Sequence, residues 1–144
     1  MDRLRASVLS DDTSFLLARA NAVALAAAHS ALVPFDLRVR SYSILALVST
    51  GTSPSQRELA EFLRLDPSQV VALIDDLERR GLIKRETDPR DRRLNVVVTT
   101  EAGDSVFREA RVAVRAAETE FRKDLSPKES EQLKALLQIL AFHL

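Results

Sequence analysis

The chain has no cysteine among its 144 residues. A disulfide, a thiolate metal site and a cysteine redox switch are therefore excluded. Glycine is scarce, with three residues, and aromatic residues make up only 5% of the chain. Hydrophobic residues still reach 46%, which suffices for a packed core in one domain-sized chain. The sequence is rich in alanine, leucine and valine, so its composition favours helices.

The sequence also lacks a combination of side chains suited to catalysis. Its two histidines, His29 and His143, lie far apart along the chain and form no metal-binding cluster. No arrangement resembles a nucleophile beside a base. We therefore expect a protein that is not an enzyme and that needs no cofactor and no metal.

No targeting segment is apparent. Residues 15–33 are apolar, but Arg19, Asn21 and His29 interrupt them, and two aspartates precede them. This pattern does not suit a secretory signal or a membrane span. A long helix buried in a protein interface is the better interpretation, with a cytoplasmic location and no membrane partner.

The chain carries no net charge, but its charges are unevenly distributed. Residues 79–93 hold seven basic and three acidic residues, which gives this segment a charge of +4. Positive charge is thus gathered at one place, as a phosphate backbone would require. The alternative is a solvated loop with local Arg–Asp pairs. The basic residues are Arg79, Arg80, Lys84, Arg85, Arg90, Arg92 and Arg93.

Two short amphipathic helices precede this segment, over residues 55–63 and 67–80. Asp66 can cap the second helix, Pro67 suits its first position, and Gln69 completes a spacing like that of a capping box. Gly81 stands where a helix C-cap is expected. Apolar residues recur at helical intervals and predict one buried stripe. That stripe consists of Val70, Leu73, Ile74 and Leu77.

A hairpin follows directly, with strands over 83–86 and 94–99 and a connecting loop over 87–93. Two helices followed by an arginine-rich hairpin are typical of a winged helix-turn-helix, a module that reads duplex DNA. An ordinary helical hairpin is the alternative for the helix pair alone. The hairpin behind the helices favours the DNA-binding interpretation.

Three segments carry a resemblance to a known family: LAEFLRLDPSQV at 59–70, LERRGLIKRETDPRDRR at 77–93 and TEAG at 100–103. With them the chain resembles the MarR (multiple antibiotic resistance regulator) family of transcription factors over nearly its full length. The resemblance implies a mostly α fold with a small β-wing. It also implies a winged helix-turn-helix flanked by N- and C-terminal dimerisation helices. The peroxide-sensing thiol of some members is excluded here.

The resulting organisation places a DNA-binding lobe at 36–100 and a helical dimerisation region at 1–35 and 101–144. Helices are expected over 12–32, 36–50, 101–123 and 127–144, in addition to the pair above. Asp36 and Thr100 are the expected caps of two of them, and Ser126 with Glu129 forms a capping box. Gly51 to Pro54 form a turn, with room for a short strand joining the wing sheet.

The terminal helices carry more apolar surface than a small winged-helix core can bury. The last helix has leucines at 133, 136, 137, 140 and 144. This surplus is best buried against a second copy, and the resemblance implies the same two-fold homodimer. The alternative is a monomeric helical bundle.

The resemblance implies a ligand-responsive regulator, in the first place a repressor, bound to double-stranded DNA at a pseudo-palindromic operator. Helix 66–80 would enter the major groove and the wing at 87–93 the minor groove. Asp91 sits where members use an acid to orient a wing arginine, and its spacing favours Arg93. Lys84 and Arg85 are either phosphate contacts or solvated side chains. The expected DNA-binding residues are Ser55, Arg57, Ser68, Gln69, Val71, Ala72, Arg90, Arg92 and Arg93.

Several positions depart from the family pattern. Members often carry Thr and Arg where this chain has Val71 and Ala72, and a basic residue where it has Asp76. Arg64 stands where Gly is common. Asp75 and Asp76 would repel phosphates if they faced them. A winged-helix module that docks on a protein, with weak or no sequence-specific DNA binding, therefore remains the alternative.

A small aromatic or phenolic effector is implied by the same resemblance, in a crevice between the dimer helices and the winged-helix lobe. An arginine with a histidine would suit a carboxylate. The alternative for each residue is an ordinary surface or interface side chain. The candidate residues are Arg19, His29, Arg38, Arg40 and Tyr42.

Overall fold

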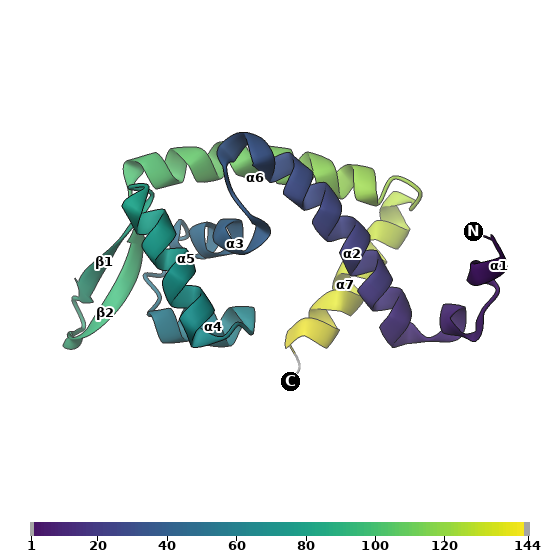
Figure 1. The fold of residues 1–144 in the computed structure, drawn as a ribbon, viewed down its shortest axis with the longest axis horizontal. Coiled ribbons are helices and arrows are strands. Elements are labelled where there is room, and N and C mark those ends of the chain that lie inside the picture. Colours follow the sequence, from purple (N-terminus) through teal and green to yellow (C-terminus); the bar gives the residue numbers. More distant parts are fainter. Residues whose placement is uncertain (1, 143–144) are drawn as a thin grey trace. The chain divides into compact units, whose positions relative to one another are not determined.

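The computed structural model describes the backbone of residues 2–142 and the side chains of residues 4–142, so His143 and Leu144 lie outside it. The chain is mainly helical with one antiparallel hairpin, which confirms the expected fold class (Figure 1). The elements are α1 (Asp2–Arg5), the 3-10 helix η1 (Val8–Asp11), α2 (Thr13–Leu32), the 3-10 helix η2 (Val33–Phe35), α3 (Val39–Val48), α4 (Gln56–Leu63), α5 (Pro67–Arg79), β1 (Ile83–Asp88), β2 (Asp91–Thr99), α6 (Glu101–Phe121) and α7 (Pro127–Phe142).

The chain divides into two units. One unit comprises residues 28–114 and contains α3, α4, α5 and the hairpin. The other combines residues 1–27 with residues 115–144. The helices α2 and α6 each contribute residues to both units.

Local side-chain bonds fix the beginnings of three helices. At α4, the Ser55 hydroxyl accepts from the Glu58 N–H at 3.2 Å, and the Glu58 carboxylate accepts from the Ser55 N–H at 2.7 Å. The predicted capping box of Ser126 and Glu129 begins α7 in the same way. At α6 the Thr100 hydroxyl accepts from the Gly103 N–H at 3.0 Å, as expected. Each bond satisfies a donor that the first helical turn leaves unpaired.

The N-terminus of α5 differs in one detail from the expectation. Asp66 is the N-cap and accepts from the Ser68 N–H at 2.8 Å, with Pro67 in the first turn, as predicted. Gln69 does not complete a capping box. Its side-chain oxygen accepts instead from the guanidinium of Arg40 at 3.4 Å, because α3 lies close enough to supply a tertiary partner.

The expected cap of α3 is wrong. Asp36 has a φ of 50° and ends the 3-10 helix η2, so α3 begins at Val39, with Arg38 as an N-cap that makes no side-chain bond. The 3-10 turn ahead of it takes up the residues that would have formed the cap. An aspartate tolerates the left-handed conformation better than most residues. The sequence pattern also does not predict α1 and η1 ahead of α2.

The end of α4 lies at Arg64, which has a φ of 53°. Position 64, where Gly is expected, therefore does have a left-handed backbone, although the residue there is an arginine. Gly81, with a φ of 71°, follows Arg80 at the end of α5, as predicted. Both helices thus terminate by reversing into the left-handed region.

The wing is longer and its turn tighter than the sequence suggests. The strands pair antiparallel from Ile83 opposite Thr99 to Thr87 opposite Asn95, and after an irregularity Asp88 pairs with Asp91. The segment 87–93, expected as a loop, is therefore mostly strand and leaves a two-residue turn at 89–90. The expected third strand near Pro54 reduces to one bond, from the Val97 N–H to the Pro54 carbonyl at 2.8 Å.

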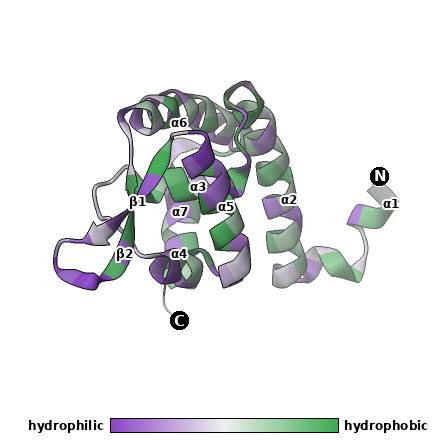
Figure 2. Ribbon diagram, turned by 60° about the vertical axis from the view of Figure 1, so that its left-hand side comes forward, coloured by the Kyte–Doolittle hydropathy of each residue, from purple (hydrophilic) through white to green (hydrophobic). Residues whose placement is uncertain are grey.

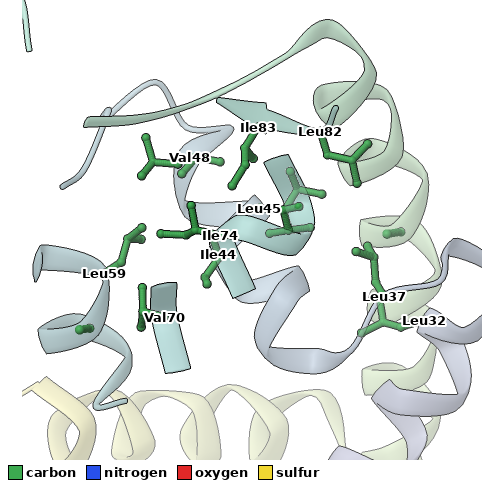
Figure 3. Close-up of a cluster of buried hydrophobic side chains, with 14 of the residues drawn as sticks. Leu32, Leu37, Ile44, Leu45, Val48, Leu59, Val70, Ile74, Leu82 and Ile83 are labelled. Atoms are coloured by element: carbon green, nitrogen blue, oxygen red, sulfur yellow. The ribbon is translucent and has the colours of Figure 1, made fainter. Parts of the chain in front are cut away.

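The core of the 28–114 unit lies between α3, α4, α5 and the start of the wing (Figure 3). Leu45, Ile74 and Ile83 meet near its centre, and all three are at most 1% exposed. The predicted stripe of α5 is buried at Val70, Ile74 and Leu77, while Leu73 is only partly buried. This packing presents the opposite face of α5 to solvent.

The other unit buries much less of its apolar surface. None of the side chains described in 4–27 and 115–142 is buried. Leu136 and Leu140 of α7 are 60% and 62% exposed, and α2 is predominantly hydrophobic along its length (Figure 2). Among the described helices, the segment 13–35 is long and apolar enough to cross a membrane by length and composition, with a mean hydropathy of 1.4.

Candidate nucleic-acid interface

The first two turns of α5 present an exposed surface of modest polarity. The polar residues Ser68 and Gln69 are exposed there, beside the small apolar side chains of Val71 and Ala72. All four are expected to face DNA, and the burial of Val70 and Ile74 on the opposite side explains their orientation. An amide beside methyl groups suits the edges of adenine and thymine in a major groove.

Arg40 lies next to Gln69 although 29 residues separate them in sequence. The arginine Nη1 donates to the Gln69 Oε1 at 3.4 Å. This bond orients the amide of Gln69 and adds a positive charge at the exposed end of α5. Arg40 is one of the effector candidates of the sequence analysis, and no pattern along the chain links it to α5.

Two aspartates hold arginines at the tip of the wing. Asp91 accepts from Arg93 through the backbone N–H at 3.0 Å, Nε at 3.0 Å and Nη2 at 2.9 Å. The Arg93 side chain is nevertheless 88% exposed, so it remains available to a ligand. Hydrogen bonds from the Arg93 side chain hold the pKa of Asp91 below its ordinary value.

The same arrangement occurs three residues earlier. Asp88 accepts from Arg90 through the backbone N–H at 2.9 Å, Nε at 3.1 Å and Nη2 at 3.2 Å, and these bonds lower the pKa of Asp88. Asp88 is buried, whereas the Arg90 side chain is 76% exposed. Sequence reasoning misses this second clamp. The repeated spacing of an aspartate two residues before an arginine could have indicated it.

The two aspartates of α5 are paired with basic residues. Asp75 accepts from Arg85 at 2.5 Å, and Asp76 accepts from Arg79. The repulsion of phosphates considered for both residues is therefore reduced by neighbouring positive charge. Their charges belong to ion pairs within the 28–114 unit, so they weigh less against DNA binding than the sequence alone suggests.

Part of the +4 segment serves internal contacts. Arg80 donates to the backbone carbonyls of Asp36 and Phe35 at 2.7 and 3.1 Å, and Arg85 is only 27% exposed. Arg85 is thus held in ion pairs within the chain and is not a freely solvated side chain, one of the two options that the sequence leaves open. Positive charge at the wing tip comes from Arg90, Arg92 and Arg93, and Figure 2 shows this tip as hydrophilic.

The proposed phosphate contacts at α4 are already engaged within the chain. The Ser55 hydroxyl bonds Glu58 at 2.7 Å in addition to capping the helix. Arg57 donates to Glu61 at 2.8 Å, but its side chain is 87% exposed, so the pair is open to solvent and weak. Arg57 is accordingly the more accessible of the two for a phosphate.

The five effector candidates do not share one environment. Arg19 lines a shallow apolar groove on α2 with Phe15 and Ala22, among other residues of the 1–27 segment. Arg38 is the N-cap of α3 and Tyr42 lies in its first turn, whereas Arg40 points to Gln69. The Tyr42 ring meets that of Phe107 with centroids 5.9 Å apart, and His29 is exposed.

Comparison with known proteins gives a consistent result. A sequence model of the MarR family matches residues 37–94. A MarR-family transcriptional regulator from Rhodococcus sp. RHA1 is 40% identical, with a TM-score of 0.88 over 95% of this chain and 99% of that one. CouR from Rhodococcus jostii RHA1, solved with p-coumaroyl-CoA, is also 40% identical, with a TM-score of 0.84 over 95% of this chain and 96% of that one.

A curated relative extends the comparison. A regulatory protein ascribed to the hcr operon of Thauera aromatica is 32% identical over 99 residues, which cover 69% of this chain. The chain spans 60% of the length of that protein. These relatives are described as regulators rather than enzymes.

Proposed function

This chain belongs to the MarR family, and from that premise we propose that it is a dimeric, ligand-responsive transcriptional repressor in the cytoplasm. The observation that carries the proposal is the pairing of two exposed surfaces in the 28–114 unit. One is the outer face of α5 at Ser68, Gln69, Val71 and Ala72, and the other is the clamped wing with Arg93. Together they provide side chains that can contact base edges and an arginine that can contact the DNA backbone or the minor groove.

The mode of binding follows from two-fold symmetry. A dimer presents two copies of α5 to successive major grooves, one helical turn apart, so the operator is pseudo-palindromic. Arg93, with Arg90 and Arg92 beside it, enters the flanking minor groove, where narrow A·T-rich DNA attracts arginine. Arg57 and the Ser55 region contact phosphates. Residues 36–100 thus form the DNA-binding lobe, and residues 1–35 with 101–144 the dimerisation region.

The exposed apolar surface of the terminal helices supports the dimer. Leu136, Leu137 and Ile139 of α7 are 39–60% exposed, and Val23 of α2 is 53% exposed. Apolar side chains exposed in this number on two helices support an interaction site there. Family membership favours a second copy of the same helices as the partner. Burial in that interface would account for the apolar character of residues 13–35 without a membrane.

The effector we propose is a small aromatic or phenolic acid or its thioester. The support is the 40% identical CouR, whose structure holds p-coumaroyl-CoA. Arg19, His29, Arg38, Arg40 and Tyr42 are its candidate contacts on this chain. An arginine there would pair with a carboxylate or a phosphate of the ligand.

Selection from a pool of randomised duplexes tests the DNA-binding part of this proposal. The wild type is expected to enrich a near-palindromic site, and Gln69→Ala is expected to relax preference at one base pair per half-site, at a cost of about 1–3 kcal/mol. Glu109→Ala, an exposed residue of α6, serves as the control. Failure of the wild type to enrich any sequence would favour a module that docks on another protein.

A further inference from the structure

Arg85 joins three elements of the 28–114 unit. Its Nη2 donates to Asp75 of α5 at 2.5 Å, and its Nη1 donates to Glu78 one turn further along the same helix. Its Nε donates to the Gln56 side chain at the start of α4, at 2.7 Å. The backbone N–H of Arg85 itself donates to Glu78 at 3.0 Å. One side chain on β1 thus holds both helices of the helix-turn-helix.

The geometry of this cluster uses the whole guanidinium. The Arg85 side chain is 27% exposed. Two carboxylates and an amide each accept a hydrogen bond from a different nitrogen of its guanidinium. A planar fork with several fixed donors can do this, whereas a lysine would offer a single point of contact. With two carboxylates against one guanidinium, the cluster has a net charge of −1, so it offers no attraction to a phosphate.

We propose that Arg85 is a positioning residue that fixes the wing strand against α5 and α4. This inference rests on the proposed DNA-binding function for its consequence. The base-reading end of α5 and the wing arginines must engage two grooves at once, so the separation between them has to be set before binding. Arg85 sets it from β1, where its guanidinium is turned to Asp75, Glu78 and Gln56. It lines one pocket with Ser55 and Arg57, so a phosphate contact is the alternative that the binding measurements must exclude. Its removal impairs simultaneous engagement of both grooves and takes away no electrostatic contact with DNA.

The positioning role is testable without DNA, because a chain that lacks cysteine accepts spin labels at chosen sites. Labels at Ala72→Cys on α5 and Thr87→Cys on the wing report their separation by pulsed electron resonance. In a dimer each labelled position occurs twice, so protein with one label per chain is measured as well, to identify the distances between protomers. We expect a narrow distribution with Arg85 present and a distribution at least about twofold broader with Arg85→Gln. Lys84→Gln, its exposed neighbour on β1, is the matched control and should leave the distribution narrow.

Two further variants keep the result interpretable. Arg85→Lys retains the charge but not the fork, so it should give an intermediate width. Asp75→Ala combined with Glu78→Ala removes both carboxylate partners and should broaden the distribution as Arg85→Gln does, which keeps the test available if Arg85→Gln folds poorly. Equal widths for the wild type and all these variants would overturn the positioning role.

Binding measurements then separate positioning from phosphate contact. Fluorescence anisotropy is measured on a duplex enriched by the wild type and on a duplex of random sequence, at several salt concentrations. Arg85→Gln should weaken binding to the enriched duplex about tenfold and to the random duplex less than about twofold, with an unchanged salt slope. An equal weakening on both duplexes with a slope lower by about one would identify Arg85 as a phosphate contact. If the wild type enriches no duplex and does not bind the random one, the proposed function fails, while the label distances still decide the role of Arg85.

Discussion

Two aspartates, Asp88 and Asp91, determine how the wing presents its arginines. Each accepts one backbone N–H and two side-chain N–H groups from the arginine two residues later. A long side chain held in this way loses less rotamer entropy when it meets DNA than a free one would. The wing therefore has its arginines partly ordered in advance, although their outer surfaces remain exposed.

The first prediction at this scale concerns the outer arginine. Arg93→Ala should weaken binding to every duplex and lower the slope of log affinity against log salt by about one unit for each phosphate that the arginine neutralises. Lys128→Ala, at the start of α7, is the control and should change neither. Anisotropy titrations at several salt concentrations measure both. An Arg93→Ala variant with wild-type affinity and slope would remove the wing from the mechanism.

The second prediction concerns acid. The pKa values of Asp88 and Asp91 lie below their ordinary value of 3.8 because each carboxylate accepts hydrogen bonds from its arginine. A depressed folded-state pKa means that the stabilisation is fully present above the ordinary value and is lost as the pH falls through the lower one. The wing clamps should therefore persist at pH 5 and down to the ordinary pKa of 3.8, and be lost only as the pH falls further, through the lowered pKa of each aspartate.

Carboxyl carbon shifts in an NMR titration provide the measurement for both aspartates. Arg90→Ala should raise the pKa of Asp88 and leave that of Asp91 unchanged, because the two clamps have different partners. An Asp88 that titrates at the same pH in this variant and in the wild type would show that Arg90 does not lower its pKa.

At the scale of elements, local signals predict the helix pair and its caps, while tertiary contacts produce what the sequence misses. Ser126 with Glu129 acts within one turn, so this spacing is sufficient to predict the start of α7. Ser55 and Glu58 carry the same local signal at α4, but from the sequence Ser55 is expected to contact phosphate and not to cap the helix. The contact of Arg40 with Gln69 and that of Arg85 with Gln56 each span 29 residues, and no periodicity encodes them. The contact of Asp91 with Arg93, two residues apart, is therefore predictable from the sequence, whereas the contacts that hold α5 from other elements are not.

Gly103 gives a prediction at this scale, because α6 approaches the end of α5 very closely there. A Cβ at this position would lie 1.9 Å from the backbone carbonyl oxygen of Leu82. Gly103→Ala should therefore destabilise the protein by about 3 kcal/mol, although alanine is the better helix former. Gly51→Ala meets no neighbouring atom but has a φ of +77°, so it should cost about 1 kcal/mol.

Chemical denaturation of both glycine variants, with the wild type alongside, measures these differences. The decisive result is which alanine variant loses more free energy of unfolding. Gly103→Ala should lose more, because its Cβ overlaps with backbone atoms, whereas at Gly51 only the backbone conformation is unfavourable. An alanine at 103 that stabilises the protein would show that α6 moves away from Leu82 at no cost.

At the scale of the whole molecule, the two units differ in how well each is buried. The 28–114 unit has a packed core of leucine, isoleucine and valine, whereas the described residues of 4–27 and 115–142 include none that is buried. Apolar side chains left exposed on α2 and α7 would destabilise an isolated chain in water. The stability of the proposed dimer and the stability of the fold are thus the same quantity.

Leu137→Asp tests this view. The substitution places a charge on the apolar face of α7, where Leu137 is 39% exposed in the single chain, and should give unfolded or monomeric protein. Lys134→Asp, on the same helix, should retain the wild-type assembly. Sedimentation velocity at micromolar concentration reports both. A wild type that sediments as a stable monomer would contradict the dimer.

The pairing of residues 1–27 with residues 115–144 in one unit has a consequence for biosynthesis. The apolar helix α2 leaves the ribosome early, but residues 115–144, which share its unit, are made only after the 28–114 unit is complete. During that interval α2 offers a long hydrophobic surface to chaperones, proteases and other nascent chains. A protein of this architecture is therefore expected to depend on the order and speed of its translation more than a chain whose neighbours in space are also neighbours in sequence.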